Sequence, residues 1–302
     1  MISITNQKVI LKKAIAKAVI SLGSKATVKA VVDKKVPKGD VLEMAKTAGL
    51  FAAKRTADMI PGCFPMPIEY TAVKFDIQEQ EIHAMVEIQT IYKTGVEVEA
   101  MHAASVVALT MYDMLKPLDN NISITQISLV DLAGTTENPK DIPPNLQAAV
   151  ISCSDSVVKG KKEDRAGKAI VKNLEQCEVI VKNYKVLPDD LEVIKENLMA
   201  ALDTGVDLVV FTGGTGLSAR DTTTEALRPL LEKEIPGIEE AIRRFGQERT
   251  PHAMFSRSVA GLIGSTLVLA LPGSSRGAEE SMDAIFPEVL HLFRAVKELG
   301  PC

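Results

Sequence analysis

The sequence of 302 residues is poor in cysteine, and its cysteines form no recognisable pattern. Cys63, Cys153, Cys177 and Cys302 include no Cys-x-x-Cys pair and no spacing typical of a zinc site. The sequence therefore predicts neither a zinc site nor a paired-thiol redox motif. We expect reduced thiols and a cytoplasmic protein.

Long apolar runs and a strong charge imbalance are also missing. No apolar run reaches the ~18 residues of a membrane-spanning helix, and the first residues lack the pattern of a signal peptide. The net charge of −4 argues against a general nucleic-acid binder. The first 40 residues nevertheless hold nine Lys and two Asp, which indicates either a solvated basic face or a local pocket for a polyphosphate.

The length predicts about two domains, and the hydrophobic content of 46% is ample for their cores. A polar segment at 133–144 carries three prolines, which is typical of a short, semi-extended linker. We place the domain boundary near Pro144. The predicted domains are residues 1–143 and 144–302.

The first domain mixes strands and helices without a strict strand–helix–strand alternation, which predicts an α+β fold with a mostly antiparallel sheet. Asp40 is a good helix N-cap, Glu43 completes a capping-box-like pair, and Pro61 ends the helix. The other predicted elements are a half-buried strand at 26–32, strands at 73–77 and 82–88, a helix at 97–115, and a strand at 122–132 with a bulge at Thr125-Gln126.

Several blocks between residues 30 and 118 agree in order and spacing with one known family. They resemble the MoaC family, the cyclic pyranopterin monophosphate synthases of molybdenum cofactor biosynthesis. The blocks are Lys38-Gly39-Asp40, Ala52–Thr56, Lys93–Ala100, Ala103–Ser105, and Ala108–Met114 with Lys116.

The MoaC resemblance implies a ferredoxin-like fold. It also implies the rearrangement of a cyclised dihydroguanosine triphosphate into cyclic pyranopterin monophosphate, with release of pyrophosphate. This chemistry needs cations for the triphosphate and a poised acid–base pair. The residues implied to be catalytic are Asp113, Lys38 and Lys116. The residues implied to bind the substrate are Lys54, Arg55, Gly62, Cys63, Phe64, Glu97, Val98 and Glu99.

Phe64 departs from the family, which has histidine in a Cys-His-Pro motif where this chain has Cys63-Phe64-Pro65. A phenyl ring can neither donate a hydrogen bond to a pterin nor carry a proton. Two hypotheses follow for the first domain. It is a working synthase with a modified pocket, or a catalytically impaired domain that serves as an oligomeric scaffold.

The second domain alternates strands and helices, which predicts a three-layer α/β fold with a largely parallel sheet. The predicted strands are 148–152, 179–181, 184–187, 208–211 and 266–271. The predicted helices are one that ends near residue 175, two at 191–202 and 238–249, and a final one that follows Ser274 and runs to residue 299.

A glycine-rich segment, Thr212-Gly213-Gly214-Thr215-Gly216, follows the strand at 208–211. Its glycines allow positive φ angles and a close approach of backbone N–H groups to a ligand, and a helix is expected just beyond. Such a segment alone is also common in tight turns. Other polar segments follow neighbouring strands, so we expect a ligand site at the carboxyl edge of the sheet. These segments are Ser154-Asp155, Leu187–Asp189, Arg220-Asp221 and Pro272–Ser274.

Residues Thr212 to Ala226 resemble the molybdopterin-binding domain of the MoaB/MogA family. The resemblance implies adenylyl transfer from ATP to molybdopterin, with Asp189 and Asp221 as catalytic residues that bind Mg²⁺. Carboxylates and substrate phosphates are the usual ligands of this ion. The residues implied to bind molybdopterin and nucleotide are Asp155, Thr212, Gly213, Gly214, Thr215, Gly216, Ser218, Pro272, Gly273 and Ser274.

The two resemblances together imply a bifunctional protein of molybdenum cofactor biosynthesis, whose substrates are small pterins and nucleotides. The alternative for the second domain is a module that binds molybdopterin without reaction. The resemblances also imply a homo-oligomer, a trimer or a hexamer. We expect neither a nucleic-acid partner nor a membrane partner.

Overall fold

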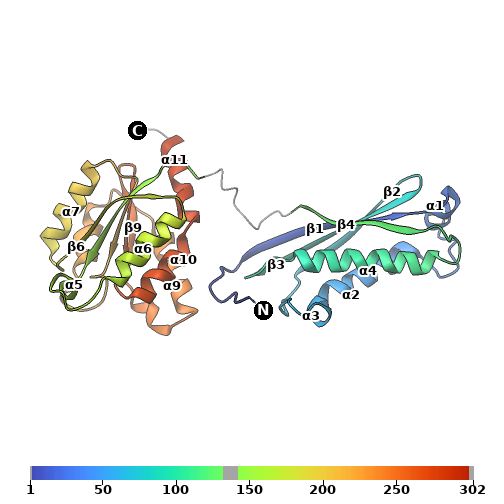
Figure 1. The fold of residues 1–302 in the computed structure, drawn as a ribbon, viewed down its shortest axis with the longest axis horizontal. Coiled ribbons are helices and arrows are strands. Elements are labelled where there is room, and N and C mark those ends of the chain that lie inside the picture. Colours follow the sequence, from blue (N-terminus) through green and yellow to red (C-terminus); the bar gives the residue numbers. More distant parts are fainter. Residues whose placement is uncertain (1, 132–141, 299–302) are drawn as a thin grey trace. The chain divides into compact units, whose positions relative to one another are not determined.

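The computed structural model describes residues 2–131 and 142–298. The chain divides into two compact units, residues 1–137 and 138–302 (Figure 1). The expected linker at 133–144 lies mostly outside the described residues, so the boundary after residue 143 stays a prediction. Among the described residues, no helix combines the length and the apolar character needed to cross a bilayer.

The first unit is a four-stranded antiparallel sheet in the order β2-β3-β1-β4, with α2 and α4 packed on one face (Figure 1). This order, with helices after β1 and β3, is the ferredoxin-like arrangement, so the predicted α+β class is confirmed. In chain order the elements are β1 (Ile10–Ser21), α1 (Lys25–Val32), α2 (Val41–Lys54), α3 (Thr56–Met59), β2 (Tyr70–Ile77), β3 (Glu81–Tyr92), α4 (Glu97–Leu115) and β4 (Ser123–Asp131).

The core of the first unit lies between the sheet and the two long helices. Ala14, Ala16, Ala18 and Ile20 of β1 are fully buried because successive side chains alternate between the two faces of a strand. Helix α2 packs closely on α4: a Cβ at Gly49 would lie 2.6 Å from Cγ2 of Val107. Burial of a side chain such as that of Ile20 stabilises the fold by roughly 1.5–3 kcal/mol.

The predicted strand at 26–32 is wrong, because Lys25–Val32 is helix α1. Ser24 caps this helix by accepting a hydrogen bond from the Thr27 amide, and the buried residues Thr27, Val28 and Val31 have helical spacing. No element was predicted for the residues of β1. A short segment of mixed apolar residues fits both periods, and only packing against the rest of the fold selects one.

The other predictions for the first unit hold in their main features. Asp40 caps α2 by accepting from the Glu43 amide, as predicted. The helix ends at Lys54, however, several residues before the predicted end at Pro61. The predicted bulge in β4 is confirmed, because the pairing with β1 shifts register at Thr125.

The second unit has a six-stranded sheet in the order β6-β5-β7-β10-β9-β8. Strands β6, β5, β7 and β10 are parallel, and β9 runs antiparallel to both its neighbours. The strands are β5 (Gln147–Cys153), β6 (Ile180–Leu187), β7 (Leu208–Thr212), β8 (Lys233–Glu234), β9 (Val259–Ile263) and β10 (Thr266–Leu271). The helices are α5 (Asp155–Val158), α6 (Arg165–Gln176), α7 (Leu191–Asp203), α8 (Thr223–Leu227), α9 (Pro236–Gln247), α10 (Ser275–Ile285) and α11 (Leu292–Glu298), with 3₁₀ helices η2 (Arg228–Leu230), η3 (Pro251–Phe255) and η4 (Glu288–His291).

Two hydrophobic clusters lie on opposite faces of this sheet, one under α6, α9 and α10 and the other under α7 and α8. The predicted three-layer α/β fold with a largely parallel sheet is therefore confirmed. The strands predicted at 179–181 and 184–187 form one strand, β6. The single final helix is wrong: α10 ends at Ile285, since Pro287 lacks the N–H that a continuous helix needs.

The register of the parallel strands places their carboxyl ends at one edge. Leu271 of β10 and Ser152 of β5 both pair with Thr212, the last residue of β7, and Cys153 pairs with Leu187 of β6. The segments that follow these strands therefore meet, as the sequence predicted.

Candidate functional sites

One charged cluster in the first unit lies at the carboxyl end of α4. Lys38 Nζ is 2.8 Å from both Asp113 Oδ2 and the main-chain oxygen of Asp113, and Lys116 Nζ is 2.8 Å from Asp113 Oδ1. Lys116 lies three residues after Asp113 at the end of the same helix, so the two side chains share a face. Lys38 comes from the loop before α2. The hydrogen bonds from Lys116 and Lys38 lower the pKa of Asp113 to about 2.

We expect NMR titration of the Asp113 carboxyl to show a midpoint near pH 2. A carboxyl whose folded-state pKa is lowered adds stability above its unfolded pKa and loses it as pH falls through the folded value. For Asp113 that window lies at acid pH, below 3.8. In Lys116→Ala the midpoint should move up toward 3.8, because the hydrogen bond from Lys116 that lowers the pKa most is lost. Lys25→Ala, which removes the remote ion pair with Glu79, should leave the midpoint of Asp113 unchanged. An unchanged midpoint in Lys116→Ala would contradict the cluster.

A second cluster lies at the amino end of α4. Burial and then the neighbouring Glu97 charge raise the pKa of Glu99, whose side chain is almost fully buried. Burial and the Glu99 carboxyl in turn raise the pKa of the Cys63 thiol. Phe64 is half-buried in the same loop, and Gly62 and the side chain of Val98 are exposed.

Lys54 and Arg55 belong to this second cluster, because α2 runs antiparallel to α4 and ends beside its first turns. The Thr56 hydroxyl lies 3.1 Å from Nδ1 of His102, which ties the end of α2 to α4. Lys54 and Arg55 are exposed, and the Arg55 guanidinium lies 6.0 Å from the centre of the Phe51 ring.

The two clusters do not meet within one chain. Glu99 and Asp113 are 14 positions apart on one continuous helix, which corresponds to about 21 Å along its axis. In Figure 1, α3 lies beside one end of α4 and α1 beside the other. The residues that the sequence grouped as one catalytic and substrate-binding set therefore form two separate groups in a single copy.

The glycine-rich loop of the second unit is built from close backbone contacts. Gly213 has a φ of +95°, and a Cβ there would lie 2.1 Å from the Cys153 oxygen. A Cβ at Gly273 would lie 2.8 Å from the Gly213 Cα. The Thr212 hydroxyl donates to the Pro272 oxygen at 2.9 Å. Only glycine allows the three strand ends to approach this closely.

Two cavities lie on either side of this loop. The first, here named the Asp189 cavity, has a volume of about 780 Å³ and is polar. The second, the His252 cavity, has a volume of about 520 Å³ and is lined by more apolar surface. Four of the lining residues are shared by the two cavities: Gly214, Asp221, Gly273 and Ser274.

The Asp189 cavity holds a carboxyl whose pKa is raised. Burial first, and then the charges of Asp155 and Asp221, raise the pKa of Asp189. Asp189 Oδ2 accepts from the Asp155 amide at 3.2 Å. Within the described residues, Asp189 Oδ1 and Thr222 Oγ1 are buried without a hydrogen-bond partner. A buried oxygen left unpaired beside a cavity indicates a ligand or ion that completes it.

Asp221 stands at the border of both cavities. Its Oδ2 accepts from the Ser218 amide at 2.7 Å, and its own amide donates to the Ser218 oxygen at 2.9 Å. The exposed Ser218 therefore shapes the turn that presents Asp221, although neither Ser218 nor Asp155 lines either of these two cavities. The buried Thr215 and the neighbouring Gly216 line the His252 cavity.

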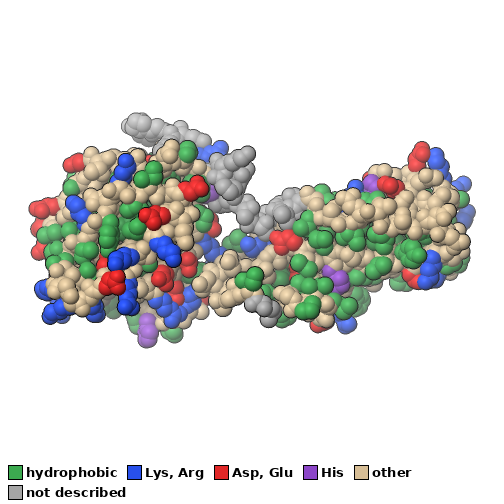
Figure 2. Space-filling view, viewed as in Figure 1, with side chains coloured by type: hydrophobic (Ala, Val, Ile, Leu, Met, Phe, Trp, Pro, Cys, Tyr) green, Lys and Arg blue, Asp and Glu red, His purple; other side chains and the backbone are tan. Residues whose placement is uncertain are grey.

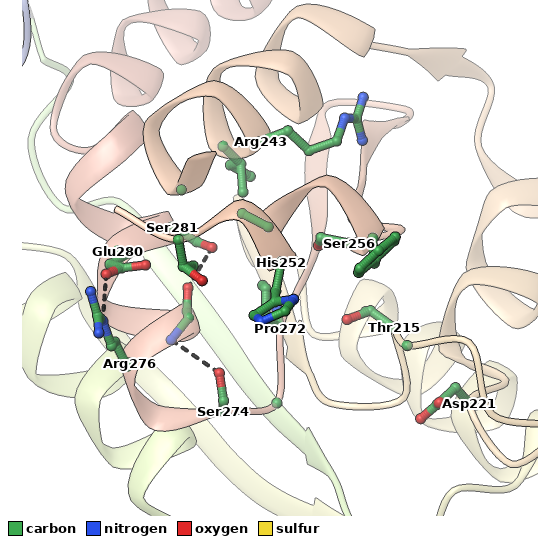
Figure 3. Close-up of a pocket in the computed structure, with 18 of the residues that line it drawn as sticks. Thr215, Asp221, Arg243, His252, Ser256, Pro272, Ser274, Arg276, Glu280 and Ser281 are labelled. Atoms are coloured by element: carbon green, nitrogen blue, oxygen red, sulfur yellow. Dashed lines mark hydrogen bonds and ion pairs between the residues drawn. The ribbon is translucent and has the colours of Figure 1, made fainter. Parts of the chain in front are cut away.

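The His252 cavity is bounded by α9, η3 and the first turns of α10. Figure 3 shows Thr215 and Asp221 on one side of it and the ion pair of Arg276 with Glu280, 2.7 Å long, on the other. The rings of His252 and Phe255 stack at a centroid distance of 6.3 Å. Ser274 caps α10 by accepting from the Gly277 amide at 3.1 Å.

Several residues that line the cavities were not predicted from the sequence. Lys161, Lys162 and Arg165 line the Asp189 cavity. These residues form a charged segment that is visible in the sequence. The segment does not directly follow a strand, so it was not predicted to lie at the carboxyl edge of the sheet. Arg243, His252 and Ser256 line the His252 cavity and come from segments with no motif. The expected helix after the glycine loop is α8, which has only five residues.

The residues present fit a magnesium ion only in part. In the described ranges, no three His, Cys, Asp or Glu side chains are grouped so as to hold a metal by themselves. Asp189 and Asp221 nevertheless line one cavity, and Asp189 has an unpaired buried oxygen. Magnesium is commonly bound by one or two carboxylates together with substrate phosphates and water. The donor set therefore fits a Mg²⁺ ion that arrives with a phosphorylated ligand.

The fold and the sites define a class: a two-domain protein in which a ferredoxin-like unit is joined to an α/β unit with two cavities around a glycine-rich loop. Comparison with known families matches residues 1–135 to the MoaC family and residues 149–291 to the family described as "Probable molybdopterin binding domain". A relative from Chlorobaculum tepidum, the "Molybdenum cofactor biosynthesis bifunctional protein", is 35% identical over 267 residues, which are 88% of this chain and 85% of the relative.

Two relatives match one unit each. The "Cyclic pyranopterin monophosphate synthase" of Thermomicrobium roseum is 40% identical over 138 residues, 44% of this chain and 81% of that protein. The "Molybdopterin adenylyltransferase" of Pyrococcus furiosus is 34% identical over 170 residues, 55% of this chain and 99% of that protein. The chain belongs to the family of bifunctional molybdenum cofactor biosynthesis proteins, with a MoaC domain followed by a MoaB/MogA-type domain.

Proposed function

We propose that the second unit transfers the adenylyl group of ATP to molybdopterin. The observation that carries the proposal is the pair of cavities that share Gly214, Asp221, Gly273 and Ser274. Such a pair suits a reaction between two bound molecules. An oxygen of the molybdopterin phosphate attacks the α-phosphorus of ATP, the bond to the outer phosphates breaks, and pyrophosphate leaves. The step requires no protein nucleophile.

The residues of the Asp189 cavity suit the phosphate side of this reaction. Lys161, Lys162 and Arg165 supply positive charge near polyphosphate oxygens. Asp189 and Asp221 would hold Mg²⁺, which when bound would offset the negative charge of the phosphates. The stacked rings of His252 and Phe255 and the apolar wall of the other cavity suit a flat heterocycle.

For the first unit, we propose conversion of cyclic dihydroguanosine triphosphate to cyclic pyranopterin monophosphate, with release of pyrophosphate. The relative from Thermomicrobium roseum carries the name of this activity. The cluster of Asp113, Lys38 and Lys116 offers two ammonium groups for phosphate oxygens and groups that can move protons during ring opening and closure. The second cluster would bind the pterin side of the substrate.

The separation of the two clusters supports a homo-oligomer. One complete synthase site requires the Asp113 cluster of one copy and the Glu99 cluster of another, since about 21 Å divides them within a chain. Hydrophobic side chains also lie exposed over the helical layer of the first unit (Figure 2). They include Met44, Phe51, Leu109 and Tyr112. A trimer or a hexamer is the proposed assembly.

The full chain tests both proposals. With molybdopterin, ATP and Mg²⁺, adenylylated molybdopterin and pyrophosphate should form in equal amounts. Binding of molybdopterin without pyrophosphate release would leave only a binding module. With cyclic dihydroguanosine triphosphate, cyclic pyranopterin monophosphate should form. Absence of that product, with restoration by Phe64→His, would identify an impaired synthase unit that acts as a scaffold.

A further inference from the structure

Arg257 contacts the glycine-rich loop but is not among the residues that line either cavity. Its Nε donates to the Gly216 oxygen at 2.7 Å, and its Nη2 donates to the Asp221 oxygen at 3.0 Å. Its Nη1 pairs with the Glu225 carboxylate. One guanidinium therefore joins both ends of the segment 216–221 to the first helix after it.

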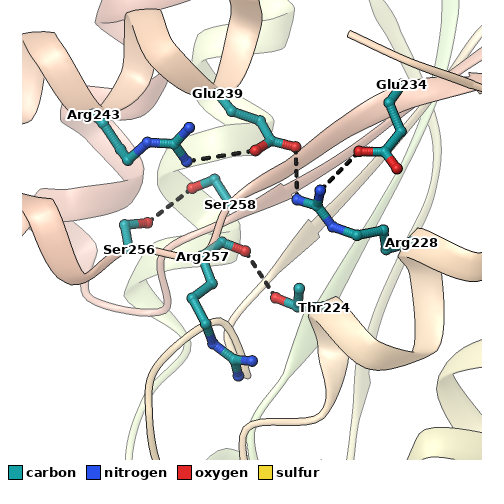
Figure 4. Close-up of polar contacts among 8 residues, drawn as sticks. All are labelled: Thr224, Arg228, Glu234, Glu239, Arg243, Ser256, Arg257 and Ser258. Atoms are coloured by element: carbon teal, nitrogen blue, oxygen red, sulfur yellow. Dashed lines mark hydrogen bonds and ion pairs between the residues drawn. The ribbon is translucent and has the colours of Figure 1, made fainter. Parts of the chain in front are cut away.

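The main chain of Arg257 adds two further contacts to the same region. Its amide donates to the Thr215 oxygen at 3.2 Å, and its carbonyl accepts from the Thr224 hydroxyl at 2.8 Å (Figure 4). The next residues, Ser258 and Val259, are fully buried at the start of β9. Arg257 thus connects the loop to the start of strand β9, which pairs with strands on both sides.

This connection matters for Asp221 in particular. The hydrogen bonds between Ser218 and Asp221 fix the shape of their turn, but they do not fix where that turn stands relative to the sheet. Asp221 Oδ2 lies directly against the backbone of Gly216, because a Cβ there would be only 2.7 Å from it. A small shift of either end of the segment therefore displaces the carboxylate. The contacts of Arg257 hold both ends.

We propose that Arg257 is a positioning residue for adenylyl transfer: it sets the place of Gly216 and Asp221 between the two cavities without touching a substrate. The role requires arginine, because its planar fork has donors for several acceptors at once, whereas lysine offers a point charge on a flexible stem. The proposal rests on the proposed adenylyl transfer, but the loop itself can be observed without turnover.

The test compares three variants of the full chain by steady-state kinetics and by hydrogen–deuterium exchange of the amides at 214–221. Arg257→Ala should lower kcat by about 10- to 100-fold, since small misplacements of reacting groups have effects of this size. KM for ATP should change by less than about threefold, because the ground-state contacts remain. Exchange of the loop amides should become faster. Arg257→Lys, which keeps the positive charge but not the planar fork, should fall between Arg257→Ala and the unaltered chain in both readouts.

Arg228→Ala is the matched control. Arg228 also joins carboxylates through its guanidinium, those of Glu234 and Glu239, and it has a similar exposure, but it does not contact the loop (Figure 4). It should leave loop exchange and kcat as in the unaltered chain. Unchanged loop exchange in Arg257→Ala, or faster exchange with an unchanged kcat, would overturn the proposal. If the unaltered chain transfers no adenylyl group, the proposed function fails, and loop exchange alone decides whether Arg257 holds the loop.

Discussion

Asp189→Asn is expected to lower the rate of adenylyl transfer by about 100- to 1000-fold, a loss of the size measured when one essential polar group is removed from an active site. Asparagine keeps the shape of the side chain and an oxygen that can accept from the Asp155 amide. It removes the negative charge that would help to hold Mg²⁺ beside the phosphates. The measurement is pyrophosphate release from the full chain with saturating ATP and molybdopterin.

The same substitution should make the second unit more stable at neutral pH. Burial raises the pKa of Asp189, so the folded state disfavours the ionised carboxylate. An acid whose folded-state pKa lies above its unfolded value reduces stability when ionised, and this loss disappears as pH falls through the folded pKa. The stabilisation by Asp189→Asn should therefore be largest at neutral pH and vanish in acid. Thermal unfolding at several pH values measures it.

Asp190→Asn is a matched control one residue along the chain. Asp190 caps α7 by accepting from the Glu192 and Val193 amides, and asparagine is an equally good N-cap. The control removes the same charge without entering the cavity, so its transfer rate should stay close to that of the unaltered chain. Normal transfer by Asp189→Asn would refute the assigned role of Asp189. Equal rate losses in both variants would reduce it to a general charge effect.

Two inactive synthase variants should restore activity to one another when they assemble together. Glu99→Gln and Lys116→Ala change opposite ends of α4, and each alone should abolish formation of cyclic pyranopterin monophosphate. If a site uses one end from each of two copies, a mixed pair has one unaltered site and one site with both changes. Pairs purified as mixed should therefore recover about half of the unaltered activity, and unselected random pairing about a quarter.

Co-expression with two different affinity tags, followed by purification on both, yields the mixed assemblies for this assay. Lys38→Ala with Lys116→Ala is the control pair, because both substitutions fall in the Asp113 cluster. Each site takes that cluster from one copy, so every site in a mixed assembly carries one of the two substitutions. That pair should stay inactive. Equal recovery in both pairs, or none with Glu99→Gln, would exclude a site shared between copies.

Local sequence patterns predicted most elements of both units, but the patterns were clearer in the second unit than in the first. In the second unit, strands buried on both faces are continuous apolar runs, such as Leu208–Thr212, and turn residues separate them clearly from the helices. In the first unit, the short segment Lys25–Val32 fits a strand or a helix almost equally well. The Ser24 cap and the packing of its buried face decide for the helix.

The candidate sites were predictable to the extent that they follow strand ends. Parallel strands of similar length end at one edge, so Asp189, Asp221 and Pro272 could be placed together before any contact was known. Arg257 could not be placed, because it precedes an antiparallel strand and acts through main-chain oxygens far from it in sequence. Lys161 and His252 reach the cavities from loops whose course depends on the packed fold.

By itself, the sequence determined the two fold classes, the glycine-rich loop and the residue types around it, since periodicity, capping and close backbone approach are local properties. Only the tertiary structure decided that the loop divides two cavities and that the Glu99 and Asp113 clusters lie at opposite ends of α4. Those facts depend on the rigid length of a helix and on contacts between distant segments, which no local pattern encodes.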